Sequence, residues 1–193
     1  MLDFLRSSSS TESKIRTAIN DEPLGPYNKE LLDLAILTHD RRALAIITSN
    51  LQKKLSKLIK KAESPKRSYS VKSLSTRHHR TPPSVQRSST VDTYFLGDSA
   101  EYRKHLGVLK CLTVIVHLCQ NGSHAFLLWV KQEYSNLICP IGRLSFHPKT
   151  SMAIYSKVEL IVRYCESTIE LTTARQSLDQ IRSELRTGIK HED

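Results

Sequence analysis

The sequence predicts an all-α fold, and three observations support this prediction. Apolar residues recur at intervals of three and four along most of the chain, whereas no segment shows the strict alternation of a half-buried strand. Residues that favour helix starts and stops separate the periodic segments. Of the 193 residues, roughly 140 remain once the ends and one polar segment are set aside, which is enough for a single core. We therefore expect one helical domain.

Three helices are expected in the first third of the chain. The first spans about residues 11–20, because Ser9 and Glu12 have the spacing of a capping box, and it ends before a Pro-Leu-Gly-Pro turn. The second spans about 28–38, and the third runs from a capping aspartate to about residue 58. The expected buried residues are Ile15, Ala18, Ile19, Leu31, Leu34, Ala35, Thr38, Leu44, Ile47, Leu51, Leu55 and Leu58.

The whole charge excess of the chain lies in residues 53–91. This segment has eleven Lys or Arg and a single acid, Glu63, whereas the remaining 18 basic and 18 acidic residues cancel. Ser, Thr and Pro dominate from Ser64 to about Gly97, so we predict that residues 59–98 form an exposed, basic and largely disordered insertion. Such a localised charge needs an anionic partner, either a membrane face or a nucleic acid.

Helical periodicity resumes after the basic segment, and we expect residues 99–186 to complete the ordered core that begins at residues 11–58. Ser99 is expected to cap a long helix that ends at an Asn-Gly pair, and Ser123 to cap the next one. A proline and a glycine at 140–142 should interrupt regular structure before two more helices, near 154–165 and 167–186. The expected buried residues are Leu106, Leu109, Leu112, Val116, Cys119, Phe126, Leu127, Val130, Ile154, Val158, Ile161, Val162, Cys165, Ile169, Ala174, Leu178, Ile181 and Leu185.

Several classes of function find no support in the residues. The apolar stretches are shorter than about 18 residues, so none should span a bilayer, and the first residues lack the pattern of a secretory signal. The four cysteines form no CxxC pair and the eight histidines no metal-binding array, so we expect core-filling thiols and no metal. Phosphate-binding and hydrolase motifs are missing as well. We expect a cytosolic protein that is not an enzyme and holds no cofactor.

Two stretches, TESKIRTAINDEPLGP and VLKCLTVIVHLCQNGS, resemble the epsin N-terminal homology (ENTH) domain of membrane-trafficking adaptors, and most of all the short epsin-like proteins of fungi. The resemblance covers residues 11–58 and 99–186, while residues 59–98 have no counterpart in an ordinary member. It implies that residues 1–193 form a single ENTH-like domain. The implied architecture is a compact superhelix of about seven to eight helices, with the basic insertion between the third and fourth.

The resemblance also implies a basic pocket for a phosphoinositide head group, whose phosphate oxygens would accept charge-assisted hydrogen bonds. The residues that it assigns to this pocket are Arg16, Lys54 and Lys110, joined by Arg103 and Lys104 at the start of the fourth helix. Two positions depart from the family pattern, since Gly107 stands in place of a histidine and Asp21 in place of an asparagine. Auxiliary membrane attraction is expected from Lys53, Lys57, Lys60, Lys61, Lys66 and Arg67.

The function that follows is a phosphoinositide-binding peripheral membrane adaptor in clathrin-associated trafficking, either in endocytosis or in Golgi and endosome transport. We expect a monomer in the cytoplasm that binds at the plasma membrane, endosome or Golgi, with clathrin-coat or adaptor proteins as partners. Because only Leu2, Phe4 and Leu5 offer apolar area at the start, membrane deformation should be weak or absent. The alternatives are a basic nucleic-acid-binding protein, disfavoured by the scarcity of aromatic residues, and a helical protein-interaction domain without lipid binding.

Overall fold

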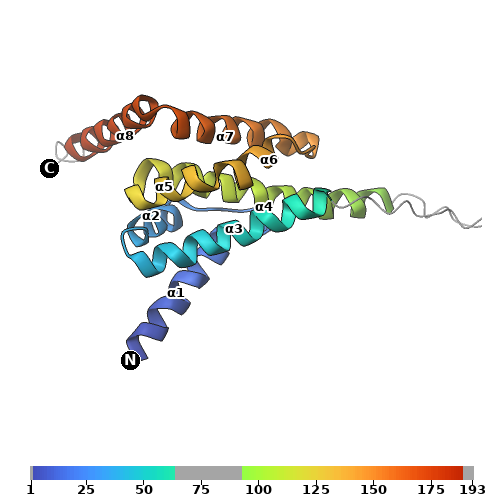
Figure 1. Ribbon diagram of the computed structural model, residues 1–193, viewed down its shortest axis with the longest axis horizontal. Coiled ribbons are helices and arrows are strands. Elements are labelled where there is room, and N and C mark those ends of the chain that lie inside the picture. Colours follow the sequence, from blue (N-terminus) through green and yellow to red (C-terminus); the bar gives the residue numbers. More distant parts are fainter. Residues whose placement is uncertain (1, 64–92, 189–193) are drawn as a thin grey trace, which may run out of the picture.

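The computed structural model describes residues 2–63 and 93–188, which form helices and contain no strand (Figure 1). This confirms the predicted all-α fold. The elements are α1 (Leu2–Ala18), α2 (Asn28–Leu37), α3 (Arg41–Glu63), α4 (Thr93–Asn121), α5 (His124–Glu133), a π-helical segment η1 (Tyr134–Ile138), α6 (Cys139–Gly142), α7 (Pro148–Glu166) and α8 (Thr168–Gly188).

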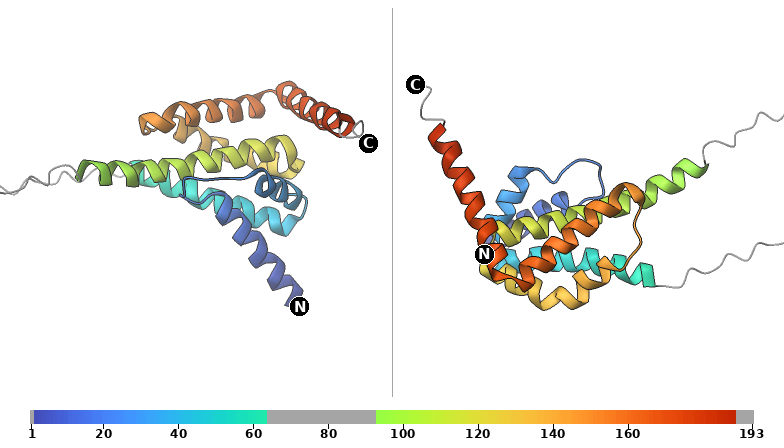
Figure 2. Two further views of the ribbon diagram at one scale, coloured as in Figure 1. Left: turned by 180° about the vertical axis from the view of Figure 1, so that it is seen from behind. Right: turned by 90° about the horizontal axis from the view of Figure 1, so that it is seen from above.

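Helix α4 is the centre of the fold, and it contacts α1, α2, α3, α5, α7 and α8. Figure 1 shows α3 along one side of α4 and α7 along the other, and Figure 2 shows the same arrangement from behind and from above. Between Val108 and Cys119 no residue of α4 is exposed, as in a helix enclosed by its neighbours. The buried apolar residues of this segment are Val108, Cys111, Leu112, Val114, Ile115, Val116, Leu118 and Cys119.

Helix α1 begins at Leu2, so the predicted start near residue 11 and the predicted cap at Ser9 are wrong. Thr11, Ile15 and Ala18 are buried, and Figure 1 shows the N-terminal part of α1 projecting away from the other helices. Residues 2–10 include no proline or glycine. They extend a helix that is already stabilised by the packing of Thr11, Ile15 and Ala18, so they avoid the unfavourable nucleation step of an isolated short helix.

Helices α3 and α4 both reach further into the predicted insertion than expected. Helix α3 continues to Glu63 and α4 begins at Thr93, so Ser99 lies inside a helix and the predicted cap there is wrong. The apolar face of α3 extends as far as Ile59, which is 7% exposed, and this burial carries the helix past residue 58. Residues 64–92, on which the prediction of disorder falls, lie outside the described part of the chain.

The segment between α5 and α7 is more helical than the sequence suggests. Ser123 caps α5 as predicted, because its hydroxyl oxygen accepts a hydrogen bond from the Phe126 backbone N–H. The expected interruption at 140–142 is wrong, since η1 and α6 continue the helical path to Gly142. Pro140 lies in the first turn of α6, where its missing N–H has no partner to lose.

Helix α8 packs on the core through Leu171 and the partly buried Ala174, so the predicted face is right at Ala174 and wrong at Ile169. Ile169 was expected to be buried but is 79% exposed, whereas Leu171 is 3% exposed. One turn further on, Arg175 donates from Nε and Nη2 to the carbonyl oxygen of Cys119, at 3.1 and 2.5 Å. These two contacts set the rotation of α8, so Ile169 turns outward. The side chains of Ile181 and Leu185 lie outside the described part.

The central packing gives a direct stability prediction. Leu112 is fully buried on α4, so Leu112→Ala should lower the free energy of unfolding by about 2–5 kcal/mol through lost apolar burial and a residual cavity. Leu32 on α2 is 46% exposed and provides the control, since Leu32→Ala should change it by no more than about 0.5 kcal/mol. Urea denaturation followed by circular dichroism measures both, and equal losses would contradict the predicted core.

The cysteines of α4 give a second prediction. Burial raises the pKa of the Cys111 and Cys119 thiols to about 12, so both stay protonated at pH 8 and lack the reactive thiolate. In the native protein iodoacetamide should therefore modify neither, while the partly exposed Cys139 reacts. In urea all three should react. Mass spectrometry of peptides gives the extent at each site, and rapid native labelling of Cys111 would exclude this packing.

Candidate functional site

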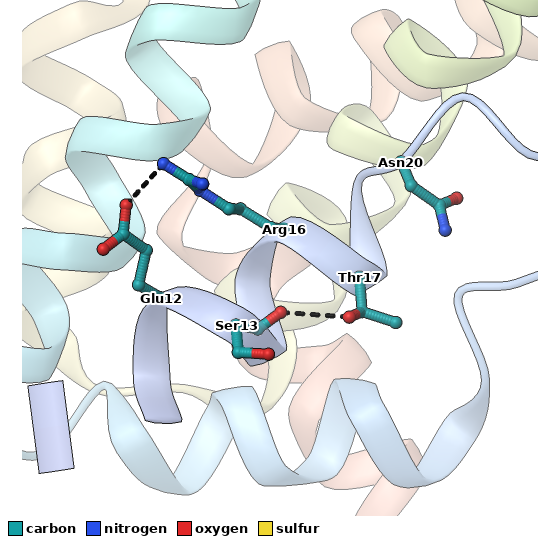
Figure 3. Close-up of a pocket in the computed structure, with 5 residues that line it drawn as sticks. All are labelled: Glu12, Ser13, Arg16, Thr17 and Asn20. Atoms are coloured by element: carbon teal, nitrogen blue, oxygen red, sulfur yellow. Dashed lines mark hydrogen bonds and ion pairs between the residues drawn. The ribbon is translucent and has the colours of Figure 1, made fainter. Parts of the chain in front are cut away.

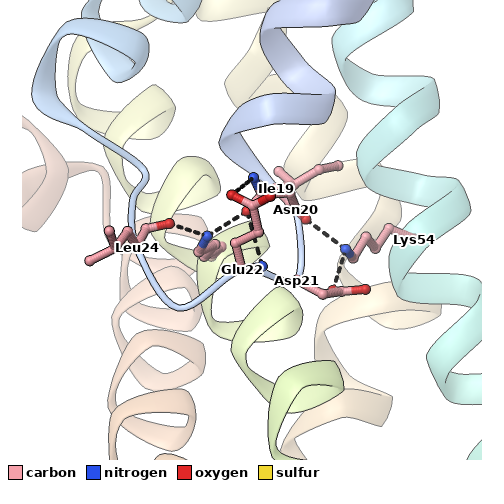
Figure 4. A network of polar contacts seen from close by, with 7 residues as sticks. Ile19, Asn20, Asp21, Glu22, Leu24 and Lys54 are labelled. Carbon is pink, nitrogen blue, oxygen red and sulfur yellow. Dashed lines mark hydrogen bonds and ion pairs between the residues drawn. The ribbon is translucent and has the colours of Figure 1, made fainter. Parts of the chain in front are cut away.

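The turn between α1 and α2 lies across α4 and is held there by two lysines. The first is Lys54 of α3, whose Nζ donates to the carbonyl oxygen of Ile19 at 2.6 Å. The same Nζ lies 2.6 Å from Oδ1 of Asp21 and forms an ion pair with it (Figure 4). The Lys54 side chain is 27% exposed, so this ion pair lies at the edge of the site.

The second lysine is Lys110 of α4, which is only 4% exposed. Its Nζ donates to Oδ1 of Asn20 at 2.6 Å and also to the carbonyl oxygen of Leu24. Burial lowers the pKa of Lys110 below its ordinary value, while three nearby carboxylates raise it; these belong to Glu22, Glu30 and Asp21. Lys110 therefore has a clear structural role, because it joins both arms of the turn to the central helix.

Gly107 allows the turn and Lys54 to come this close to α4. A Cβ atom at this position would lie 2.0 Å from Oδ1 of Asp21 and 2.9 Å from Nζ of Lys54. Neither distance is compatible with van der Waals contact. The absence of a side chain at residue 107 is thus a requirement of the observed Lys54–Asp21 ion pair.

Arg16 occupies a different place from the two lysines. Its guanidinium forms an ion pair with Glu12 at 2.7 Å on the exposed side of α1, and its side chain is 69% exposed. It lies in an open pocket of about 430 Å³. In Figure 3 Arg16 and Asn20 point to opposite sides. The pocket is lined by Glu12, Ser13, Arg16, Thr17 and Asn20. Asn20 also accepts from Lys110, so it is the residue that links the Arg16 pocket to the lysine site.

The other predicted cations lie further along α3 and α4. Arg103 precedes Lys110 by seven residues and Lys61 follows Lys54 by seven, so each shares a helix face with its inner lysine, two turns away. Figure 1 shows α3 and α4 running antiparallel, so the C-terminal end of α3 and the first turns of α4 lie at the same end of the domain, where the view from above in Figure 2 shows them diverging. The exposed cations at this end are Lys57, Lys60, Lys61, Arg103 and Lys104, and Lys53 is exposed one turn earlier. Lys66 and Arg67 lie outside the described residues.

The inner and outer cations have different electrostatic surroundings. The inner pair, Lys54 and Lys110, lies among three carboxylates and makes hydrogen bonds to the turn. In contrast, Arg103 and Lys104 are exposed and form no ion pair within the described residues. The family resemblance assigned all four to the head-group pocket, and the structure separates them into two pairs. The sequence could not identify Asn20 and Leu24 as the hydrogen-bond acceptors of Lys110. An asparagine amide and a backbone carbonyl form no recognisable sequence motif.

Comparisons with known proteins agree with this architecture. The family model for the ENTH domain matches residues 8–178. The chain belongs to the ENTH domain family. Its fold also matches the crystal structure of the human epsinR ENTH domain, with a TM-score of 0.56 and 17% identity, over 88% of this chain and 96% of that one. No curated protein matches it.

Membership places this ENTH domain in a family of membrane and clathrin adaptors. Within the described residues, no helix has the length and apolar character needed to cross a membrane. The same residues contain no cluster of three or more metal-ligating side chains. The contacts of its lysines therefore give the most specific information about the site.

The buried lysine gives a third prediction. Lys110→Met keeps most of the side-chain volume but removes the donor to Asn20 and Leu24, so it should destabilise the ENTH domain by about 1–3 kcal/mol. Lys104→Met on the exposed side of α4 serves as the control, with an expected change within about 0.5 kcal/mol. Thermal and urea unfolding measure both variants. If Lys110→Met is as stable as Lys104→Met, Lys110 does not hold the turn.

Proposed function

We propose that this ENTH domain is a phosphoinositide-binding peripheral membrane adaptor in clathrin-associated vesicle trafficking. Its family supports the adaptor role. The observation that carries the membrane role is the set of exposed cations at the end of the domain where residues 64–92 join α3 to α4, namely Lys57, Lys60, Lys61, Arg103 and Lys104. A phosphoinositide presents several negative charges on one head group, and clustered cations attract it more strongly than dispersed ones.

The magnitudes are sufficient for reversible binding. Each Lys or Arg held near an anionic leaflet contributes about 1 kcal/mol, so a few simultaneous contacts give an attraction of several kcal/mol. Salt should weaken this attraction, because exposed charges are screened over a Debye length of about 8 Å at physiological ionic strength. Residues 64–92, which join α3 to α4, add six Lys or Arg and one Asp by sequence. The two helix ends and the segment that joins them thus concentrate positive charge.

The test is a charge reversal at this end of α4. Arg103→Glu combined with Lys104→Glu should reduce binding to vesicles of phosphatidylcholine containing phosphatidylinositol 4,5-bisphosphate by about tenfold or more. Lys29→Glu combined with Lys131→Glu is the matched control, because both residues are exposed and lie on α2 and α5, away from the junction of α3 and α4 (Figure 1). Co-sedimentation at several salt concentrations measures both.

Two results would contradict the proposal. An equal loss in both double variants would mean that only net charge matters. Tighter binding to a DNA duplex than to the vesicles at matched salt would favour a nucleic acid as the partner, because the same exposed cations can contact phosphates of either kind.

A further inference from the structure

We propose that Asp21 is a specificity-determining residue of this domain, which acts as an internal competitor for ligand phosphate at Lys54. The inference rests on the proposed function and extends it from membrane attraction to head-group selectivity. Its starting point is that the ammonium group expected to bind phosphate already has an anionic partner within the chain, at 2.6 Å.

The contacts leave the inner lysines little capacity for a ligand. Lys54 directs donors to the Asp21 carboxylate and to the Ile19 carbonyl, which uses two of its three N–H groups. Lys110 likewise directs donors to Asn20 and Leu24 and is almost entirely buried. A phosphate at this site therefore competes with the Asp21 carboxylate for Lys54, since the buried Lys110 can be reached only by moving the turn.

Charge opposes the same approach. The carboxylates of Glu22, Glu30 and Asp21 all act on Lys110, so the two inner cations are outnumbered by acids within the site. The Asp21 carboxylate is 52% exposed, which places it at the surface where a ligand would enter. A phosphate group at this position meets repulsion from a fixed negative charge before it can reach Lys54.

The consequence is a domain that responds to the density of negative charge more than to the arrangement of phosphates on one ring. The outer cations at the junction of α3 and α4 remain exposed to a membrane surface. A soluble inositol phosphate lacks the surrounding leaflet and would depend on the inner pair, where Asp21 competes with it. We therefore expect weak binding of soluble head groups by the unmodified protein.

Asp21→Asn tests the competition directly, because the amide oxygen can still accept from Lys54 and hold the turn while the negative charge is lost. Calorimetry with soluble inositol 1,4,5-trisphosphate should show affinity about tenfold higher than for the unmodified protein. Asp33→Asn is the matched control. Asp33 pairs with Lys14 at 2.9 Å and is 37% exposed, so its substitution removes the same charge from a surface ion pair without touching Lys54. It should change the affinity by less than about twofold.

Gly107→Ala gives a second route that leaves the net charge unchanged. Its new Cβ would lie 2.0 Å from Oδ1 of Asp21 and 2.9 Å from Nζ of Lys54, so the ion pair cannot keep its present geometry, and the carboxylate, which is the more crowded group, has to shift most. The alanine also favours the helical backbone of α4. We expect tighter binding of the soluble trisphosphate here too, and thermal unfolding shows that the variant is folded.

The outcomes separate this inference from the proposed function. If Asp21→Asn binds the soluble trisphosphate no better than Asp33→Asn, the competition does not exist, whatever the vesicles show. If Asp21→Asn gains affinity as expected, the inference is supported. Co-sedimentation of the unmodified protein with phosphoinositide vesicles decides the proposed function independently, and its failure would remove the membrane role even where the soluble ligand binds.

Discussion

The burial of the C-terminal half of α4 is the constraint on which the rest of this structure depends. Six other helices contact α4, and from Gly107 to Gln120 none of its residues is exposed. A helix segment that is enclosed in this way needs neighbours around it, so the order of packing follows from this segment. Lys110 is the one charged residue within it. Its charge is tolerated because the turn after α1 supplies two acceptors, which fixes that turn in place.

For the inner cations, Lys54 and Lys110, a structural role and a ligand-binding role conflict. As a structural group, Lys110 must keep its acceptors on the turn, and Lys54 must keep its contact with Ile19. As ligand-binding groups, both would have to release those acceptors. Arg103 and Lys104 face no such conflict, since both are exposed near the start of α4. Helices α3 and α4 therefore each have an inner lysine that supports the turn and exposed cations further from the core.

The sequence predicted the helices better than it predicted their ends or their partners. Ser123 was identified as a cap because its role depends on a residue three positions away. Ser9 and Ser99 have equally suitable local patterns, but the helices run through both positions and begin at Leu2 and Thr93. Ile169 was misplaced because contacts with α4, distant in the sequence, set the rotation of α8. The partners of Lys54 and Lys110 were out of reach for the same reason, since 33 and 90 positions separate them from Asp21 and Asn20.

Asp21 has a physical rationale in the unbound protein. The charge of Lys54 disfavours that of Lys110, and the Asp21 carboxylate offsets part of this repulsion together with Glu22 and Glu30. The acidic turn stabilises the inner pair when no phosphate is present. An asparagine at position 21 could still accept from Lys54 but would remove one of these three negative charges. The choice of residue at this one position thus sets a balance between stability of the empty site and affinity for a phosphorylated ligand, while Gly107 provides the space in which an aspartate can meet Lys54.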